Sequence, residues 1–249
     1  MTLLTLCQNA ARQVGLPAPA TIVGNGDQAA VDLLALARRE GTLLARGHDW
    51  AVLTSEHTFA TAAGSASYDL PADFRSLATA TVWNRGTHRP VRGPLTPAAW
   101  QARVSGPTAS PRTATRFRIR AEAGVRRFVL EPTPVAAETL AFDYVSTHWC
   151  RSAGGAGQET WLADDDVALI EEGLIELGLV WRTLSRLGLP YGEERADYEA
   201  ELMRARARDG GMAVVSLDRG GRRRDDAGSI AGTPPSWGGT PGLIWGYSD

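Results

Sequence analysis

Between residues 161 and 208, hydrophobic positions recur every three or four residues, which is typical of amphipathic helices. The pattern predicts two long helices separated by a turn, where Gly188 tolerates a left-handed conformation and Pro190 cannot continue a helix. The first helix is expected to begin at Asp164, Asp165 and Asp166, because carboxylates favour the exposed N–H groups of a helix start. Its apolar stripe is Val167, Ile170, Leu174, Leu177, Trp181, Leu184 and Leu187, of which Ile170, Leu174, Leu177, Trp181 and Leu184 form the predicted helical core.

The second of these helices, residues 193–208, is acidic at its start and basic at its end, an order that agrees with the helix dipole. The N-terminal part of the chain has the same helical spacing at residues 2–14 and 28–46. All these helices are apolar on one side. We therefore expect helices from both ends of the chain to cover one another in a four-helix layer.

The middle of the chain changes to the alternating pattern of strands. Turns are expected at residues 84–86 and 122–124, a short helix at 97–104 with Thr96 as its N-cap, and a flexible connector at 152–157. The predicted strands are 55–61, 76–83, 88–91, 115–120, 126–131 and 138–146. The predicted fold is α+β: a helical domain (1–50 and 158–209), an inserted antiparallel β domain (51–157) and an extended C-terminal arm (210–249).

Residues 210–249 are rich in Gly and Pro and lose all periodicity after Leu217. A segment of this kind cannot recover the entropy of ordering, on the order of 1 kcal/mol per residue, from its own contacts. It nevertheless ends in large apolar side chains, which favours an arm that docks on a partner over a disordered tail with incidental aromatics. The candidate binding residues of the arm are Arg222, Arg223, Arg224, Trp237, Leu243, Ile244, Trp245 and Tyr247.

Composition and charge exclude several classes of function. The formal net charge of −2 excludes a nucleic-acid binder that works by bulk positive charge, and every one of the 26 cationic side chains is Arg. Cys7 and Cys150 are too few for a disulfide framework and are expected to be idle, buried thiols. The N-terminus has neither a basic region nor a long apolar run, so we expect no signal peptide and no membrane span.

No pattern typical of an enzyme is found. The acidic run 164–166 with Glu171 and Glu172 could form a metal or acid–base cluster, but helix capping accounts for it. The four His residues lack metal-ligand spacing, and the Gly-rich turn at 24–26 follows no strand. We therefore expect no catalytic residue, no metal site and no cofactor.

Arg116, Arg118 and Arg120 alternate along a predicted strand, so all three point to the same face. This face could meet the phosphates of DNA. It could equally be a solvated or subunit-facing surface opposite the apolar side chains of Phe117 and Ile119.

A series of short motifs lies at residues 68–74, 83–86, 93–100, 116–119, 130–132, 142–146, 164–166 and 177–182. This ordered series resembles the head-to-tail adaptor (connector, head-completion) proteins of tailed bacteriophages, most closely those called tail tubular protein A or DNA-stabilisation protein. The resemblance covers about residues 1–210.

The resemblance implies a structural virion protein at the head–tail junction, assembled in the host cytoplasm. A ring of twelve copies would bind the portal protein through the C-terminal arm and a tail or nozzle protein through the β domain. Double-stranded DNA would pass through its channel, and no membrane is involved. Two alternatives remain: a tail terminator or tail-hub ring protein, and a cell-wall hydrolase that uses residues 164–166 and Glu171.

Overall fold

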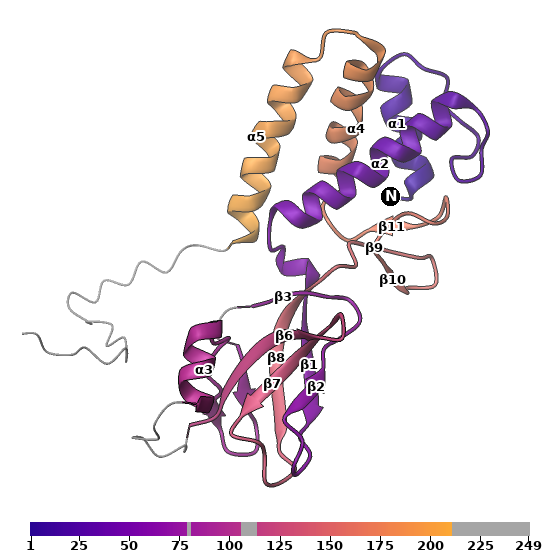
Figure 1. Ribbon diagram of the computed structural model, residues 1–249. Coiled ribbons are helices and arrows are strands. Elements are labelled where there is room, and N and C mark those ends of the chain that lie inside the picture. Colours follow the sequence, from indigo (N-terminus) through magenta and orange to yellow (C-terminus); the bar gives the residue numbers. More distant parts are fainter. Residues whose placement is uncertain (79–80, 106–113, 211–249) are drawn as a thin grey trace, which may run out of the picture. The chain divides into compact units, whose positions relative to one another are not determined.

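The computed structural model describes residues 1–78, 81–105 and 114–210, all of which lie in one compact unit, Met1–Met212. Helices come from both ends of this unit and strands from its middle (Figure 1), so the predicted α+β class is confirmed. The helices are α1 (Leu3–Gln13), α2 (Gln28–Gly47), α3 (Pro97–Ser105), α4 (Glu172–Leu187) and α5 (Gly192–Asp209).

Helix α4 is the centre of the helical layer, because α1, α2 and α5 all pack against it (Figure 1). Leu174 and Leu179 on its inner face are fully buried together with Leu6 of α1 and Leu44 of α2. The helix ends as predicted, with Gly188 in the left-handed region at φ 72° and its N–H directed to the carbonyl groups of Leu184 and Ser185.

Helix α4 starts later than predicted. The helix begins at Glu172, and the acidic run lies in the loop that precedes it. The carboxylate of Asp164 accepts hydrogen bonds from the backbone of Ile22 and Val23, and the buried Asp166 accepts from the backbone of Leu162 and Ala163. These carboxylates therefore satisfy the N–H groups of loops and do not cap a helix.

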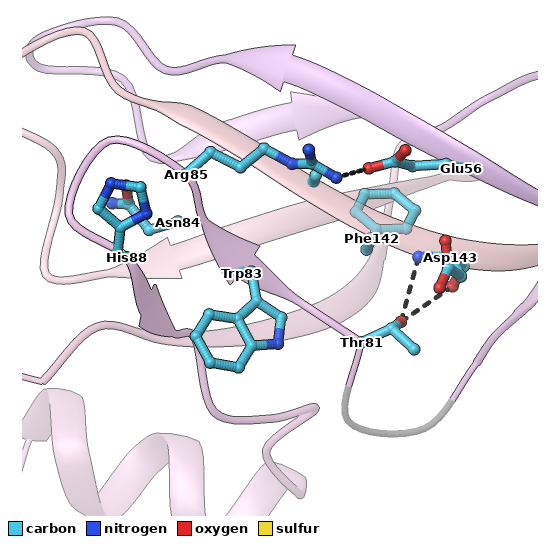
Figure 2. A pocket seen from close by; sticks show the side chains of 9 residues that line it. Glu56, Thr81, Trp83, Asn84, Arg85, His88, Phe142 and Asp143 are labelled. Atoms are coloured by element: carbon cyan, nitrogen blue, oxygen red, sulfur yellow. Dashed lines mark hydrogen bonds and ion pairs between the residues drawn. The ribbon is translucent and has the colours of Figure 1, made fainter.

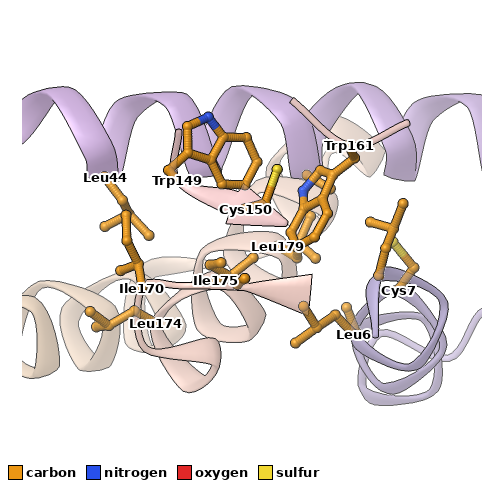
Figure 3. Close-up of a cluster of buried hydrophobic side chains, with 14 of the residues drawn as sticks. Leu6, Cys7, Leu44, Trp149, Cys150, Trp161, Ile170, Leu174, Ile175 and Leu179 are labelled. Carbon is orange, nitrogen blue, oxygen red and sulfur yellow. The ribbon is translucent and has the colours of Figure 1, made fainter. Parts of the chain in front are cut away.

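A small three-stranded sheet, in the order β10 (Gly157–Gln158), β9 (Cys150–Arg151) and β11 (Val167–Ala168), completes the helical core. The segment predicted as a flexible connector is the turn between β9 and β10, held by a hydrogen bond from Ser152 N–H to the carbonyl of Ala156. Trp149 and Trp161 flank this sheet in the core (Figure 3), edge to face with ring centroids 5.0 Å apart. The prediction of a connector was wrong because Gly-rich turns also close hairpins.

The remaining strands form two antiparallel sheets with a second core between them. One sheet has the order β1 (Thr54–Ala60), β8 (Thr139–Ser146), β4 (Trp83–Asn84), β5 (Arg89–Pro90), and β3 (Phe74–Leu77) also pairs with β8. The other has the order β2 (Ser67–Asp69), β7 (Val125–Glu131), β6 (Arg116–Glu122). Phe128 of β7 stacks on Phe142 of β8 with ring centroids 5.5 Å apart, so aromatic side chains of both sheets share this core.

The β region confirms the predicted turns and one predicted cap but not every predicted strand. The turns after Asn84 and Glu122 are confirmed, and Thr96 accepts a hydrogen bond from Ala99 N–H at the start of α3, as predicted. The predicted strand 76–83 is wrong, because it is divided between β3 and β4. Both strands pair with β8, and the Thr81 hydroxyl bonds to the backbone of Asp143 of that strand.

Candidate functional site

A buried carboxylate connects three helices of the helical layer. Glu40 of α2 is 0% exposed and accepts hydrogen bonds from Arg182 Nε of α4 and from the Tyr198 hydroxyl of α5, both at 2.5 Å. Burial, and then the Glu40 carboxylate, raise the pKa of Tyr198. Gly178 gives this carboxylate room, since a Cβ there would lie 2.5 Å from Glu40 Cδ. Sequence reasoning missed this site, although a Glu on the apolar face of a predicted helix was a signal for it.

The outward faces of α2 and α5 differ in charge. On α2, Arg39 and Arg46 are exposed beside Leu43, which is 45% exposed. On the first turns of α5, Glu193 and Asp197 are exposed, and Met203 further along is 66% exposed. Within the described residues, none of these four charged side chains has a hydrogen bond or an ion pair. The surface of α2 beside the exposed Leu43 is therefore basic, whereas the first turns of α5 carry unpaired carboxylates.

The Arg residues of β6 lie on one face, as the alternation predicts. Phe117 between them is 1% exposed and belongs to the β core, whereas Arg120 is exposed. Arg120 donates to Glu122, and Arg127, its partner across the strands, is 3.1 Å from Asp69. Arg116 and Arg118 are half-buried on the same face. This face is thus partly neutralised by acidic groups and does not form an isolated basic patch.

An open hollow of about 660 Å³ lies on the other sheet (Figure 2). Trp83 of β4 borders it with 46% of its side chain exposed, and Glu56 of β1 reaches across to form an ion pair with Arg85. Asp143 supplies a second carboxylate to its lining. Trp and Arg are enriched at protein–protein interfaces, and here Trp83 and Arg85 both line the hollow.

Three of the acidic residues considered for catalysis, Asp164, Asp166 and Glu171, bind partners within the described fold. Asp164 and Asp166 bind backbone N–H groups, as described above, and Glu171 pairs with Arg208 at 3.0 Å. Among the described residues, no cluster of three or more His, Cys, Asp or Glu side chains could hold a metal ion. Burial, followed by the Asp164 carboxylate, raises the pKa of the Cys7 thiol to about 12. Burial, followed by the Asp166 carboxylate, raises the pKa of the Cys150 thiol to about 12.

The predicted helical core residues differ in how deeply they are buried. Ile170 and Leu174 are buried, and Leu177, Trp181 and Leu184 are half-buried against the same core. The arm residues Arg222, Arg223, Arg224, Trp237, Leu243, Ile244, Trp245 and Tyr247 lie outside the described residues.

The unpaired charges on α2 and α5 and the exposed Trp83 are surface features of a kind found at protein–protein contacts. The family model described as SU10 adaptor protein matches residues 1–229, so the chain belongs to the SU10 adaptor family, a family of phage head–tail adaptors. Membership makes it a structural component of a phage virion that contacts other virion proteins. No curated protein matches the sequence. None of the helices in the described part of the chain is long and apolar enough to cross a membrane.

Proposed function

We propose that this adaptor forms a ring of twelve copies that joins the portal to the tail and continues the DNA channel, in the manner of the tail tubular protein A group. In this arrangement the helical domain (1–50 and 158–209) forms the ring, the β domain (51–157) faces the tail or nozzle protein, and the arm (210–249) binds the portal. Its role is structural and not catalytic, at the head–tail junction of a virion assembled in the host cytoplasm.

The observation that carries the ring is the pair of unlike helix faces. A closed ring needs two different, complementary surfaces on each subunit. The exposed guanidinium groups of Arg39 and Arg46 and the exposed carboxylates of Glu193 and Asp197 lie on α2 and α5, and neither set is neutralised within the described chain. An acidic α5 that meets the basic α2 face of the next copy would neutralise both sets and cover Leu43 and Met203.

The charge of the chain suits a channel through which DNA slides. A net charge of −2 gives no bulk attraction for phosphate, and Arg120 and Arg127 are already paired with carboxylates. Arg116 and Arg118 would then lie against DNA or against a neighbouring subunit, with contacts too few to hold the duplex in place.

Charge reversal tests the ring. We expect Arg39→Glu with Arg46→Glu to abolish the ring in sedimentation measurements, because like charges would then meet across the contact. Mixing this variant with Glu193→Arg/Asp197→Arg should restore association between the two chains. Arg89→Glu, an exposed Arg on β5, is the matched control and should assemble normally. Normal rings from the double reversal would refute this contact.

Truncation tests the arm. Removal of residues 222–249 should abolish attachment to the portal protein and leave the unfolding transition unchanged, since both described cores lie before residue 211. A pull-down with portal and with tail-tube protein separates the candidates, because a tail terminator or hub protein would retain only the tail component. Undiminished portal attachment of the truncated chain would overturn the role of the arm.

A further inference from the structure

The hollow that Trp83 borders, the Trp83 hollow, contains a carboxylate without a partner. Asp143 of β8 is half-buried, and among the described residues its side chain makes no hydrogen bond and no ion pair. Glu56 of β1 lies directly opposite Asp143, so both carboxylates stand on the same face of the sheet (Figure 2). Only Glu56 is neutralised, because Arg85 pairs with it. With His88 neutral, the lining keeps one uncompensated negative charge.

The same face places an aromatic wall beside this charge. Ala141 lies two positions before Asp143 on β8, so its side chain points to the same side of the sheet. Trp83 of β4 pairs directly with Ala141 and is 46% exposed. Because Ala141 contributes only a methyl group at the middle of this face, the indole ring and the carboxylates border an open space (Figure 2). The hollow therefore combines an accessible indole ring with an unneutralised carboxylate.

The helical layer shows which side chain satisfies a Trp and a carboxylate together. The guanidinium group of Arg182 lies over the ring of Trp181, 4.3 Å from its centroid, and Arg182 Nε donates to Glu40 at 2.5 Å. A planar guanidinium group can stack on an indole ring and bind a carboxylate at once, whereas an ammonium group is a compact point charge. The Trp83 hollow supplies the ring and the carboxylate of such a set, and the one guanidinium group in its lining, that of Arg85, is already paired.

We propose that the Trp83 hollow binds an arginine side chain presented by the tail or nozzle protein. The guanidinium group would stack on Trp83 and pair with Asp143. The identity of the partner rests on the proposed function, in which the β domain meets the tail. The choice of arginine rests on the charge and the indole ring of the hollow, because a neutral or acidic side chain would leave Asp143 without a counter-charge. The contact uses none of the residues assigned to the ring.

A small arginine probe tests the hollow without any partner protein. The probe is a capped glycine peptide with one central arginine, and the readout is the fluorine NMR signal of Trp83 in the fluorotryptophan-labelled full-length chain. This signal is identified by its absence from Trp83→Phe. We expect saturable binding, and at least about tenfold weaker binding of the same peptide with citrulline, which has the shape of arginine without its charge. Equal affinity for the two peptides, or an unmoved Trp83 signal, would overturn the proposal.

Two substitutions in the hollow should change the peptide affinity in opposite directions. Asp143→Asn keeps the size of the side chain and removes its charge, so binding should weaken at least about tenfold. Arg85→Met releases Glu56 and should strengthen binding, since both carboxylates then attract the ligand. Asp165→Asn, at an exposed carboxylate outside the hollow, is the matched control and should bind as the wild type. Equal affinities of Asp143→Asn and Asp165→Asn would refute the site.

The arm of the chain is a second source of arginine, at Arg222, Arg223 and Arg224. Removal of residues 222–249 separates this source from a partner protein, because a hollow filled by the arm would become free for the peptide. We expect the full-length and truncated chains to bind the arginine peptide equally. Binding that becomes about tenfold tighter on truncation would assign the hollow to the arm and overturn a tail partner.

Attachment of the full-length chain to the tail or nozzle protein tests the partner. Asp143→Asn and Trp83→Ala should attach at least about tenfold more weakly than the wild type, and Asp165→Asn should attach normally. Thermal unfolding of the two hollow variants checks that both are folded. A wild type that does not attach would overturn the proposed function together with this partner. Wild-type attachment that both hollow variants preserve would overturn the role of the hollow alone.

Discussion

Glu40 joins α2, α4 and α5 through one carboxylate. Its removal leaves Arg182, only 12% exposed, and the Tyr198 hydroxyl without an acceptor. Breaking a buried pair in this way costs roughly 3–5 kcal/mol, because a desolvated charge remains. We expect Glu40→Ala to lower the free energy of unfolding in urea by about this amount. Glu199→Ala, which breaks the exposed pair with Arg195, should cost only about 0.3–0.5 kcal/mol. Similar losses for the two variants would contradict the prediction.

Asp73 makes stability depend on pH. Burial alone would raise its pKa, but hydrogen bonds from Ser146 and Tyr144, with a contribution from His148, outweigh burial and hold the pKa below its usual value. A carboxyl group whose pKa is lower in the folded state stabilises the fold above its unfolded-state pKa of about 3.9. That contribution is lost as the pH falls through the folded-state pKa.

Thermal unfolding between pH 7 and pH 2.5 checks this effect. The wild type should lose more stability over the acid part of this range than Asp73→Asn, which has no carboxyl group to protonate at this position. Asp69→Asn is the matched control, because the Asp69 side chain is 76% exposed. A wild-type pH profile parallel to that of Asp73→Asn would rule out the assigned role.

At the scale of elements, periodicity predicted the helices well because each has one apolar face and clear end signals. Helix α1 spans Leu3–Gln13 against a prediction of 2–14, and α2 spans Gln28–Gly47 against 28–46. The predicted start of α4 was wrong because the two carboxylates bind backbone N–H groups of loops. Asp164 accepts from Ile22, which is distant in the sequence, and Asp166 accepts from Leu162 in the turn before it. A local pattern cannot distinguish those acceptors from a helix cap.

Two glycines of α4 separate helix propensity from helix packing. A Cβ on Gly173 would meet nothing within 4 Å, whereas a Cβ on Gly178 would collide with Glu40. Gly173→Ala should therefore stabilise the fold by up to about 1 kcal/mol through lower backbone entropy in the unfolded state. We expect Gly178→Ala to destabilise it by about 1–3 kcal/mol, since the buried carboxylate must move. Urea unfolding of both variants measures the difference, and a gain in stability for Gly178→Ala would show that the α2–α4 contact is looser than described.

At the scale of the whole molecule, the sequence predicted the α+β class and a phage head–tail adaptor, but not how the two cores are joined. It also missed the buried Glu40 and its partners Arg182 and Tyr198. These features depend on which segments become neighbours, and single-sequence periodicity reports burial without identifying the partner. The adaptor assignment came from ordered motifs, whereas the surfaces that could carry the assembly emerged only from the fold.

Arg75 of β3 joins the two cores. Its guanidinium group donates to the carbonyl groups of Ala45 and His48 at the end of α2 and pairs with Asp49. Charge-assisted hydrogen bonds of this kind contribute about 1.5–3 kcal/mol. We expect Arg75→Met to let the β region open separately from the helical layer. Hydrogen exchange of β8 should then become at least tenfold faster while that of α4 stays unchanged. Arg85→Met, which removes the exposed pair with Glu56, is the control, and hydrogen exchange of β8 and of α4 should both stay as in the wild type. Equal acceleration in β8 and α4 of Arg75→Met would mean that the cores unfold as one unit without this link.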